Sequence, residues 1–206
     1  MIVTKMVKIL TEYWPMLIRG AGMTLYISMI ATIIGTTIGL LVGIIRTIPM
    51  PERGIKRGFL KVINGLLSAY IEFFRGTPMM VQAMVIYYGS AEAFGLSMDK
   101  TFAAILIVSI NTGAYMSEIV RGGIVSIDKG QFEAAHALGM NHVKTMTNVI
   151  MPQVIRNILP ATGNEFVINI KDTSVLNVIS VSALYFATKS IAGNTLVFYP
   201  PFFIAC

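Results

Sequence analysis

An uncharged segment from Gly22 to Ile45 is the feature that most constrains the fold of this chain. It contains 24 consecutive residues without Asp, Glu, Lys or Arg. At about 1.5 Å per residue, a helix of this length crosses a hydrocarbon core of roughly 30 Å with some tilt. The segment therefore predicts a membrane-spanning α-helix.

The composition of the whole chain agrees with a membrane protein. Of the 206 residues, 55% are hydrophobic and 13% are charged, whereas soluble domains carry roughly 25% charged residues. The high apolar content also excludes a disordered chain. The single cysteine, Cys206, excludes a disulfide within the chain and a zinc site built from cysteines.

Four further apolar segments follow, so we expect an all-α, polytopic membrane protein made of one domain, residues 1–206. The predicted transmembrane segments are residues 22–45, 66–89, 101–121, 149–170 and 196–206. Because the last segment has 11 residues and reaches about half-way across a bilayer, we expect the last helix to be truncated. We also expect Pro152, Pro160 and Gly163 to break the fourth span.

Two other stretches are not predicted to span the membrane. Residues 1–20 mix charged and apolar side chains, a pattern typical of an amphipathic helix that lies in the interface, with Trp14 at headgroup depth. Residues 173–188 are uncharged but number only 16, which predicts a short, re-entrant or interfacial helix. Within the first span, small residues recur every four positions, which predicts close packing against another helix. They are Ala31, Gly35, Gly39 and Gly43.

The basic residues predict the orientation. The loop after the first span holds one acid and five bases, namely Glu52, Arg46, Arg53, Lys56, Arg57 and Lys61. Because basic loops stay in the cytoplasm, we place this loop inside and the N-terminus outside. The loop at residues 128–148 then also lies inside. A nucleic-acid patch is a poorer interpretation, because the basic cluster directly adjoins a membrane helix.

Polar residues inside the spans are candidates for the substrate path, because ionisable groups at membrane depth normally face a cavity or a partner. They are Asn111, Asn164, Glu165, Glu72, Arg75 and Glu118. For Glu72 and Arg75, which have the spacing of an ion pair on one helical face, that pairing is the alternative interpretation. Glu118 and Arg121 have the same spacing near the cytoplasmic boundary, where snorkelling of the side chains is the alternative. Glu165 could bind the ammonium group of an amino acid, and Asn111 could donate to its carboxylate.

The loop at residues 128–148 is predicted to contain a short exposed helix at residues 131–138. The stretch is rich in Ala and Glu, and Gly139 suits a C-terminal cap. Small side chains allow close backbone approach, so this helix is suited to dock into a groove on a partner. The alternative is an ordinary loop helix that rests on the bilayer.

Four motifs along the chain resemble ABC importer permeases. Glu133-Ala134-Ala135, Gly139 and Val149-x-Met151-Pro152 keep the spacing of the EAA signature of that family, with conservative changes at residues 149 and 151. Three more motifs resemble the polar amino acid permeases. They are Glu72-Phe-Phe-Arg-Gly-Thr-Pro78, Tyr115-Met-Ser-Glu-Ile-Val-Arg-Gly-Gly123 and Lys171-Asp-Thr-Ser174. Together the matches cover roughly residues 15 to 200.

The resemblance implies a type I ABC importer permease core of five transmembrane helices in a bacterial inner membrane. It implies that an ATPase docks on a coupling helix through Glu133, Ala134, Ala135 and Gly139. The implied partners are a cytosolic ATPase dimer, a second permease subunit, an extracytoplasmic solute-binding protein and a polar amino acid substrate. ATP would be bound by the partner subunits, so no cofactor is expected on this chain.

The chain itself is not expected to be an enzyme. It contains no Gly-x-x-x-x-Gly-Lys-Ser/Thr loop for ATP phosphates. His136 and His142 lack the spacing and carboxylate of a metal site, so no metal is expected either. The energy for transport must come from an ATPase partner or from an ion gradient, and the alternative function is a gradient-driven transporter or channel. The identity of the amino acid, and homodimer or heterodimer assembly, remain open.

Overall fold

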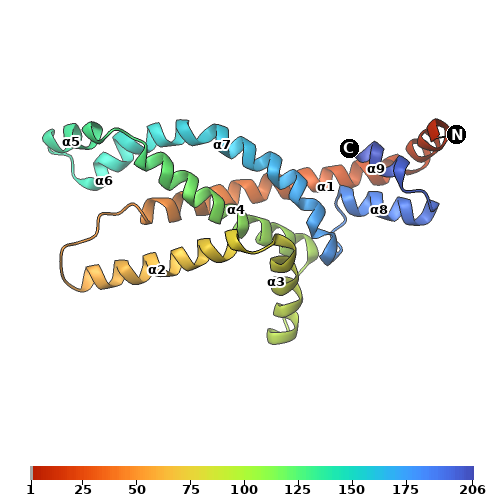
Figure 1. The fold of residues 1–206 in the computed structure, drawn as a ribbon, viewed down its shortest axis with the longest axis horizontal. Coiled ribbons are helices and arrows are strands. Elements are labelled where there is room, and N and C mark those ends of the chain that lie inside the picture. Colours follow the sequence, from red (N-terminus) through yellow and green to blue (C-terminus); the bar gives the residue numbers. More distant parts are fainter. Residues whose placement is uncertain (1) are drawn as a thin grey trace. The chain divides into compact units, whose positions relative to one another are not determined.

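The computed structural model describes residues 2–206, and these form helices and connections without a β-strand. The elements are α1 (Ile2–Ile45), α2 (Ile55–Gly76), α3 (Met79–Phe94), α4 (Lys100–Val125), α5 (Lys129–Ala137), α6 (His142–Thr145), the π-helical turn η1 (Met146–Ile150), α7 (Met151–Asp172), the 3₁₀ helix η2 (Thr173–Ile179), α8 (Leu184–Thr195) and α9 (Tyr199–Ala205) (Figure 1). The prediction of an all-α chain is confirmed.

Two of these helices, α1 and α4, are long and apolar enough by themselves to cross a membrane. A third candidate is a bent pair, His142–Ile179 with Leu184–Thr195. In this pair, η2 and α8 occupy the stretch for which the sequence predicts a short, re-entrant or interfacial helix. The predicted number of five spans, and the interfacial position of the N-terminal segment, stay predictions.

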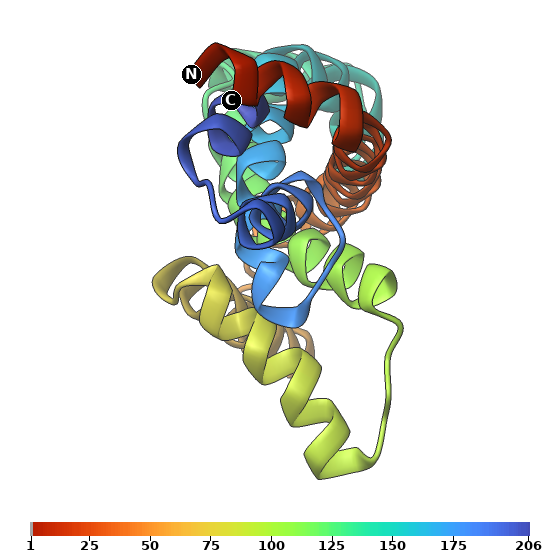
Figure 2. The same cartoon turned by 90° about the vertical axis from the view of Figure 1, so that its right-hand side faces the viewer.

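The N-terminal segment and the first span form one continuous helix instead of two. Residues 2–20, predicted as a separate helix, belong to α1; Met1 lies outside the described residues. Gly20 does not break the helix, because it packs against α8: a Cβ there would lie 3.0 Å from the Cα of Leu184. Pro15 lies inside α1, and Figure 2 shows the first turns of the helix running across the direction of the turns that follow. A proline removes one backbone hydrogen bond and commonly kinks a helix in this way.

The predicted second span, residues 66–89, is not one helix. It comprises the end of α2 and most of α3, with an interruption at Thr77 and Pro78. Both residues have extended backbone conformations, with ψ of 147° and 133°. The physical reason is Pro78, whose ring excludes the preceding residue from the helical region.

The predicted break in the fourth span is wrong. Helix α7 continues through Pro160 and Gly163, and Pro152 occupies its second position, where a proline is tolerated. Near Pro160, the hydroxyl of Thr162 donates to the carbonyl of Ile158 at 3.1 Å. The proline removes only the bond from position 160 to the carbonyl of Arg156, and neighbouring helices, Ser and Thr side chains and small local adjustments allow a membrane helix to accommodate this loss without a break.

The contacts divide the chain into two compact units. The first unit comprises Met1–Ala31, Pro78–Val108 and Phe166–Cys206, and the second comprises Thr32–Thr77 and Ser109–Glu165. The largest core cluster of the first unit includes Ile27, Ile107 and Leu176. A smaller cluster joins the first turns of α1 to α8 and contains Ile9, Leu17 and Ile191. Figure 2 shows α9, at the C-terminus, beside these first turns.

In the second unit, the glycine face of α1 packs tightly against α4. A Cβ on Gly35 would lie 2.6 Å from the Cβ of Thr112, and one on Gly43 would lie 2.8 Å from the Cβ of Val120. A Cβ on Gly39 would lie 2.8 Å from the backbone carbon of Met116. The predicted close packing of these glycines is therefore confirmed.

The hydrophobic core cluster of the second unit packs against the segment that the sequence predicts to be a cytoplasmic loop, residues 128–148. It joins the end of α4 to η1 and the start of α7. The buried members are Met116, Val120, Ile124, Ile127, Met146, Ile150, Val154 and Ile158, with Leu40, Ile44 and Phe132 packed against them. Figure 1 shows α5 and α6 next to these helix ends.

Candidate functional site

Helix α5 is formed and bounded by local chemistry. At its start, the carboxylate of Asp128 accepts from the backbone N–H of Gly130 at 2.7 Å, a normal N-cap contact. At its end, Gly139 adopts φ +77°, and the N–H of Met140 donates to the carbonyl of Ala135 at 3.0 Å. This left-handed glycine and its six-to-one bond stop the helix, so the predicted cap at Gly139 is confirmed.

The predicted docking residues lie on different faces of α5. Ala135 is 3% exposed and therefore does not belong to a free docking face, and Phe132 packs α5 against the second-unit cluster. Glu133, Ala134 and Gly139 are exposed. The exposed face of α5 thus carries one acid, Glu133, among small and polar residues that include Lys129 and His136, while its less exposed residues, Phe132 and Ala135, are apolar.

Two apolar side chains next to this face were not among the predicted site residues. Leu138, directly after α5, is 79% exposed, and Val143 in α6 is 68% exposed. Isolated exposed apolar residues are ordinary. The sequence gives no signal for these two, because their exposure depends on which side of α5 packs on the cluster.

Helical structure is continuous from α6 to α7, whereas a turn at residues 138–141 separates α5 from α6. Asn141 caps α6 by accepting from the N–H of Lys144 at 2.9 Å, and η1 then leads directly into Met151. The second half of the EAA-like motif, Val149 to Pro152, therefore lies where the π-helical turn becomes α7. Helix α6 is therefore joined to the start of α7 by backbone that is already helical.

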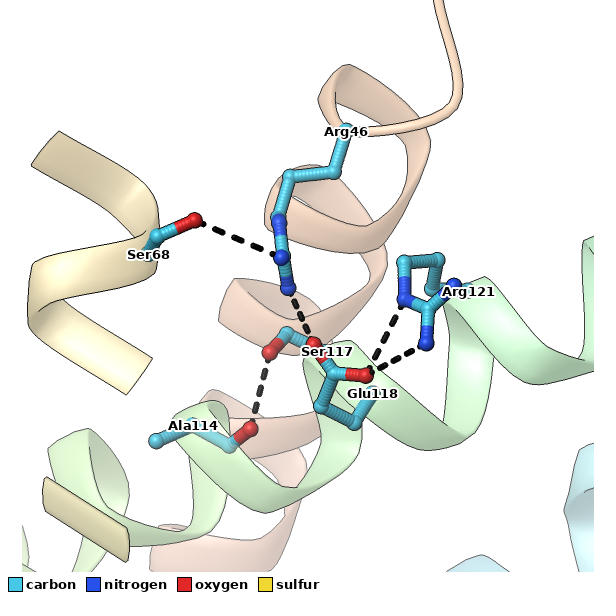
Figure 3. Close-up of polar contacts among 6 residues, drawn as sticks. All are labelled: Arg46, Ser68, Ala114, Ser117, Glu118 and Arg121. Atoms are coloured by element: carbon cyan, nitrogen blue, oxygen red, sulfur yellow. Dashed lines mark hydrogen bonds and ion pairs between the residues drawn. The ribbon is translucent and has the colours of Figure 1, made fainter. Parts of the chain in front are cut away.

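Glu118 lies at the centre of a polar cluster between three helices (Figure 3). One carboxylate oxygen accepts from Arg121 on the next turn of α4, with distances of 3.0 Å and 2.8 Å to two guanidinium nitrogens. The other oxygen accepts from Arg46 at the end of α1. Arg46 also lies 3.4 Å from the hydroxyl of Ser68 in α2. Glu118 thus forms the contact with Arg121 that their spacing allows, whereas Arg46 was predicted only as part of a basic loop.

Glu72 and Arg75 do not form the ion pair that their spacing allows. The ion pairs recorded for residues 2–206 join Glu118 to Arg46 and to Arg121. Both Glu72 and Arg75 are exposed on α2, and the guanidinium carbon of Arg75 lies 5.4 Å from the centre of the Tyr115 ring. A cation over an aromatic face is attractive, and this contact connects α2 to α4.

Asn111 is 9% exposed, and its amide donates to the backbone carbonyl of Phe74 at 3.2 Å. The carbonyl at Phe74 would normally accept from the N–H four residues later. That residue is Pro78, which has no N–H. The side-chain amide of Asn111 therefore supplies a donor to the end of α2 where the proline has none.

Removing this amide is expected to destabilise the protein. Asn111→Ala would remove this part-buried hydrogen bond between α4 and α2, at a cost of roughly 0.5–1.5 kcal/mol, so we expect a melting temperature a few degrees lower in detergent. The matched control is Asn157→Ala, because Asn157 is an exposed helical residue of the same unit. Equal melting temperatures for the two variants would contradict the capping role.

The neighbours Asn164 and Glu165 are oriented differently. Asn164 is exposed, whereas Glu165 is 6% exposed and has an interaction partner within the described structure. Because a buried carboxylate is tolerated only when it is partnered, the carboxylate of Glu165 is part of the packed interior of the second unit.

The Lys171–Ser174 motif lies in the first unit, where Lys171, Thr173 and Ser174 line a cavity of about 330 Å³.

Comparison with known proteins shows which family has this arrangement. A family described as "Binding-protein-dependent transport system inner membrane component" matches residues 54–205. The chain belongs to this family. Helices α2 to α8 and the EAA-like motif fall inside the matched residues, and the resemblance predicted from the four motifs is confirmed.

Characterised relatives of this permease family cover most of the chain. The glutamine transport system permease protein GlnP of Escherichia coli (strain K12) is 43% identical over 182 residues, which are 87% of this chain and 78% of the relative. The arginine transport system permease protein ArtQ of Bacillus subtilis (strain 168) is 33% identical over 191 residues, which are 93% of this chain and 83% of the relative.

A solved structure has the same fold. The structure described as "Crystal structure of an amino acid ABC transporter with histidines" is similar with a TM-score of 0.80 and 36% identity. The alignment covers 95% of this chain and 86% of that chain. The predicted fold class, an ABC importer permease made of membrane helices, is confirmed.

Proposed function

We propose that this chain is the transmembrane permease subunit of an ATP-driven importer of a polar amino acid, energised by a separate ATPase that docks on α5. Glutamine and arginine permeases among the relatives support the substrate class. The partners are a cytosolic ATPase dimer, a second permease subunit and an extracytoplasmic solute-binding protein. The membrane is the bacterial inner membrane, with the N-terminus outside and α5 inside.

The single observation that carries this proposal is the construction of α5. It exposes Glu133 and Ala134, whereas Ala135 is buried and Phe132 packs against the cluster at the end of α4 and the start of α7. A short helix that is exposed on one face and packed on the other is suited to move with a docked partner. Leu138 and Val143 supply apolar area beside the acidic residue for that contact.

In the proposed cycle, the permease alternates between two access states. ATP binding closes the ATPase dimer and displaces α5, and the packed ends of α4 and α7 follow it. The paired permeases then face outward and receive the solute from its binding protein, and ATP hydrolysis resets them. Each ligand biases a two-state element for which it has different affinities.

Reconstitution tests the proposal. Proteoliposomes that contain the permease with its ATPase and binding protein are assayed for uptake from a panel of labelled polar amino acids. We expect uptake that requires ATP inside the vesicle on the side of α5. Uptake that follows an imposed ion gradient and needs no ATPase would contradict the proposal and support a gradient-driven transporter.

Glu165 is proposed to line the solute path together with Asn164 and Asn111. Because charge-assisted hydrogen bonds contribute roughly 1.5–3 kcal/mol, Glu165→Gln should lower uptake about tenfold or more. Binding of the ATPase should be unchanged. Glu92→Gln, at an exposed position of α3, is the control and should transport normally. Unchanged uptake and unchanged solute-stimulated ATP hydrolysis in Glu165→Gln would remove Glu165 from the path.

A further inference from the structure

The Glu118 cluster connects helix ends that are far apart in the sequence. Arg46 and Glu118 are separated by 72 residues, and both side chains are partly buried. Arg46 ends the backbone bonding of α1, because its N–H donates to the carbonyl of Val42. Arg46 therefore connects the Glu118 carboxylate of α4 to the end of α1. The guanidinium group of Arg46 also lies 3.4 Å from the hydroxyl of Ser68 in α2.

The same stretch of α4 also contacts the coupling region. Val120 packs against Gly43 of α1 on one side, and it belongs to the cluster that holds Ile150 and Phe132 on the other. Glu118 lies two residues before Val120. The end of α4 is thus bounded by α1 and by the elements that carry α5, and the ionic contacts occur within this segment.

Apolar packing and charge-assisted hydrogen bonds constrain this segment differently. Dispersion contacts are numerous but individually weak and non-directional, so they permit small sliding and rotation of one helix on another. Hydrogen bonds between ions have preferred distances and angles. Arg46 is therefore suited to fix the register of α1 against α4, whereas Arg121, on the same helix as Glu118, cannot do so.

We propose that Glu118 and Arg46 are positioning residues for coupling: their bond makes the ends of α1, α2 and α4 move together when α5 is displaced. This inference rests on the proposed function. Without the bond between Glu118 and Arg46, α4 would still follow α5, but α1 and α2 would follow less completely. The ATPase would then dock and hydrolyse ATP without a full response to the solute.

The test uses the assembled transporter in proteoliposomes, with Arg46→Gln compared to Arg121→Gln. Three quantities are measured: the ATPase recovered with the permease, basal ATP hydrolysis, and its stimulation by solute-loaded binding protein. Arg46→Gln should retain the ATPase and lose stimulation about fivefold or more, the lower end of typical coupling between two sites. Arg121→Gln should keep its stimulation within about twofold, because the bond between helices remains.

The outcomes separate this inference from the proposed function. Stimulation that is unchanged in Arg46→Gln, or equally reduced in both variants, would overturn the inference, and so would loss of the ATPase from Arg46→Gln. Failure of the unaltered permease to retain the ATPase would instead contradict the proposed function. If Arg46→Gln does not accumulate in the membrane, Ser68→Ala replaces it, because this change removes one Arg46 contact and keeps both charges. A reduced stimulation is expected there, and unchanged stimulation would overturn the inference.

Discussion

Reversing the charge at Glu133 should prevent the ATPase from being recovered with this permease. Glu133 is exposed on the outer face of α5, so Glu133→Arg changes the docking face without disturbing the apolar inner face. Central interface positions commonly cost 2 kcal/mol or more when altered, which corresponds to a loss of affinity of about 30-fold or more. The measurement is co-purification of the ATPase from detergent extracts, together with ATP-dependent uptake.

The control carries the same substitution at the same exposure but outside the docking surface. Glu92 is an exposed residue near the end of α3, and Glu92→Arg should co-purify the ATPase at the level of the unaltered chain. Full ATPase recovery with Glu133→Arg would show that α5 is not the docking element. Equal losses with both variants would show that net charge, and not the face of α5, controls association.

The second large effect is expected from a single added methyl group in the first helix. In Gly39→Ala, the new Cβ would meet the backbone of α4, 2.8 Å from the carbonyl carbon of Met116 and 2.9 Å from the nitrogen of Ser117. Backbone atoms cannot move aside as a flexible side chain can. Overpacking of this kind costs roughly 1–3 kcal/mol, so the melting temperature in detergent should fall by several degrees.

The same substitution at Gly22 should have the opposite sign. Gly22 is exposed in α1, and no atom lies within 4 Å of an added Cβ. Because alanine has a higher helix propensity than glycine, Gly22→Ala should stabilise the helix by roughly 0.5–1 kcal/mol. Thermal unfolding of the two variants gives the comparison. A Gly39→Ala protein as stable as Gly22→Ala would contradict the close packing of α1 on α4.

Features that depend on local chemistry could be predicted from the sequence. Gly139 ends a helix because glycine, which has no Cβ, readily adopts a positive φ, and the spacing of the glycines at residues 35, 39 and 43 defines one face whatever it packs on. The contact of Glu118 with Arg121 follows from a separation of three residues on one helix.

Features that depend on tertiary placement could not be predicted in this way. The sequence shows that Glu118 needs a positive partner, but Arg46, 72 residues away, is one of many bases. Asn111 completes the backbone bonding that Pro78 interrupts, which requires α2 and α4 to be adjacent. The break predicted at Pro160 is absent because proline costs a helix one bond, and the remaining bonds and neighbouring side chains hold it together.

The most direct test of the account is the side of the membrane on which α5 lies. The only natural cysteine is Cys206, so Leu138→Cys in a Cys206→Ser background places one strongly exposed thiol beside α5. In cells that express the permease without its ATPase, which would otherwise cover this position, a membrane-impermeant maleimide should label the thiol in inside-out vesicles and not in intact spheroplasts. Val3→Cys in the same background is the opposite control and should be labelled from outside. Labelling of Leu138→Cys in intact spheroplasts would contradict docking of a cytosolic ATPase on α5.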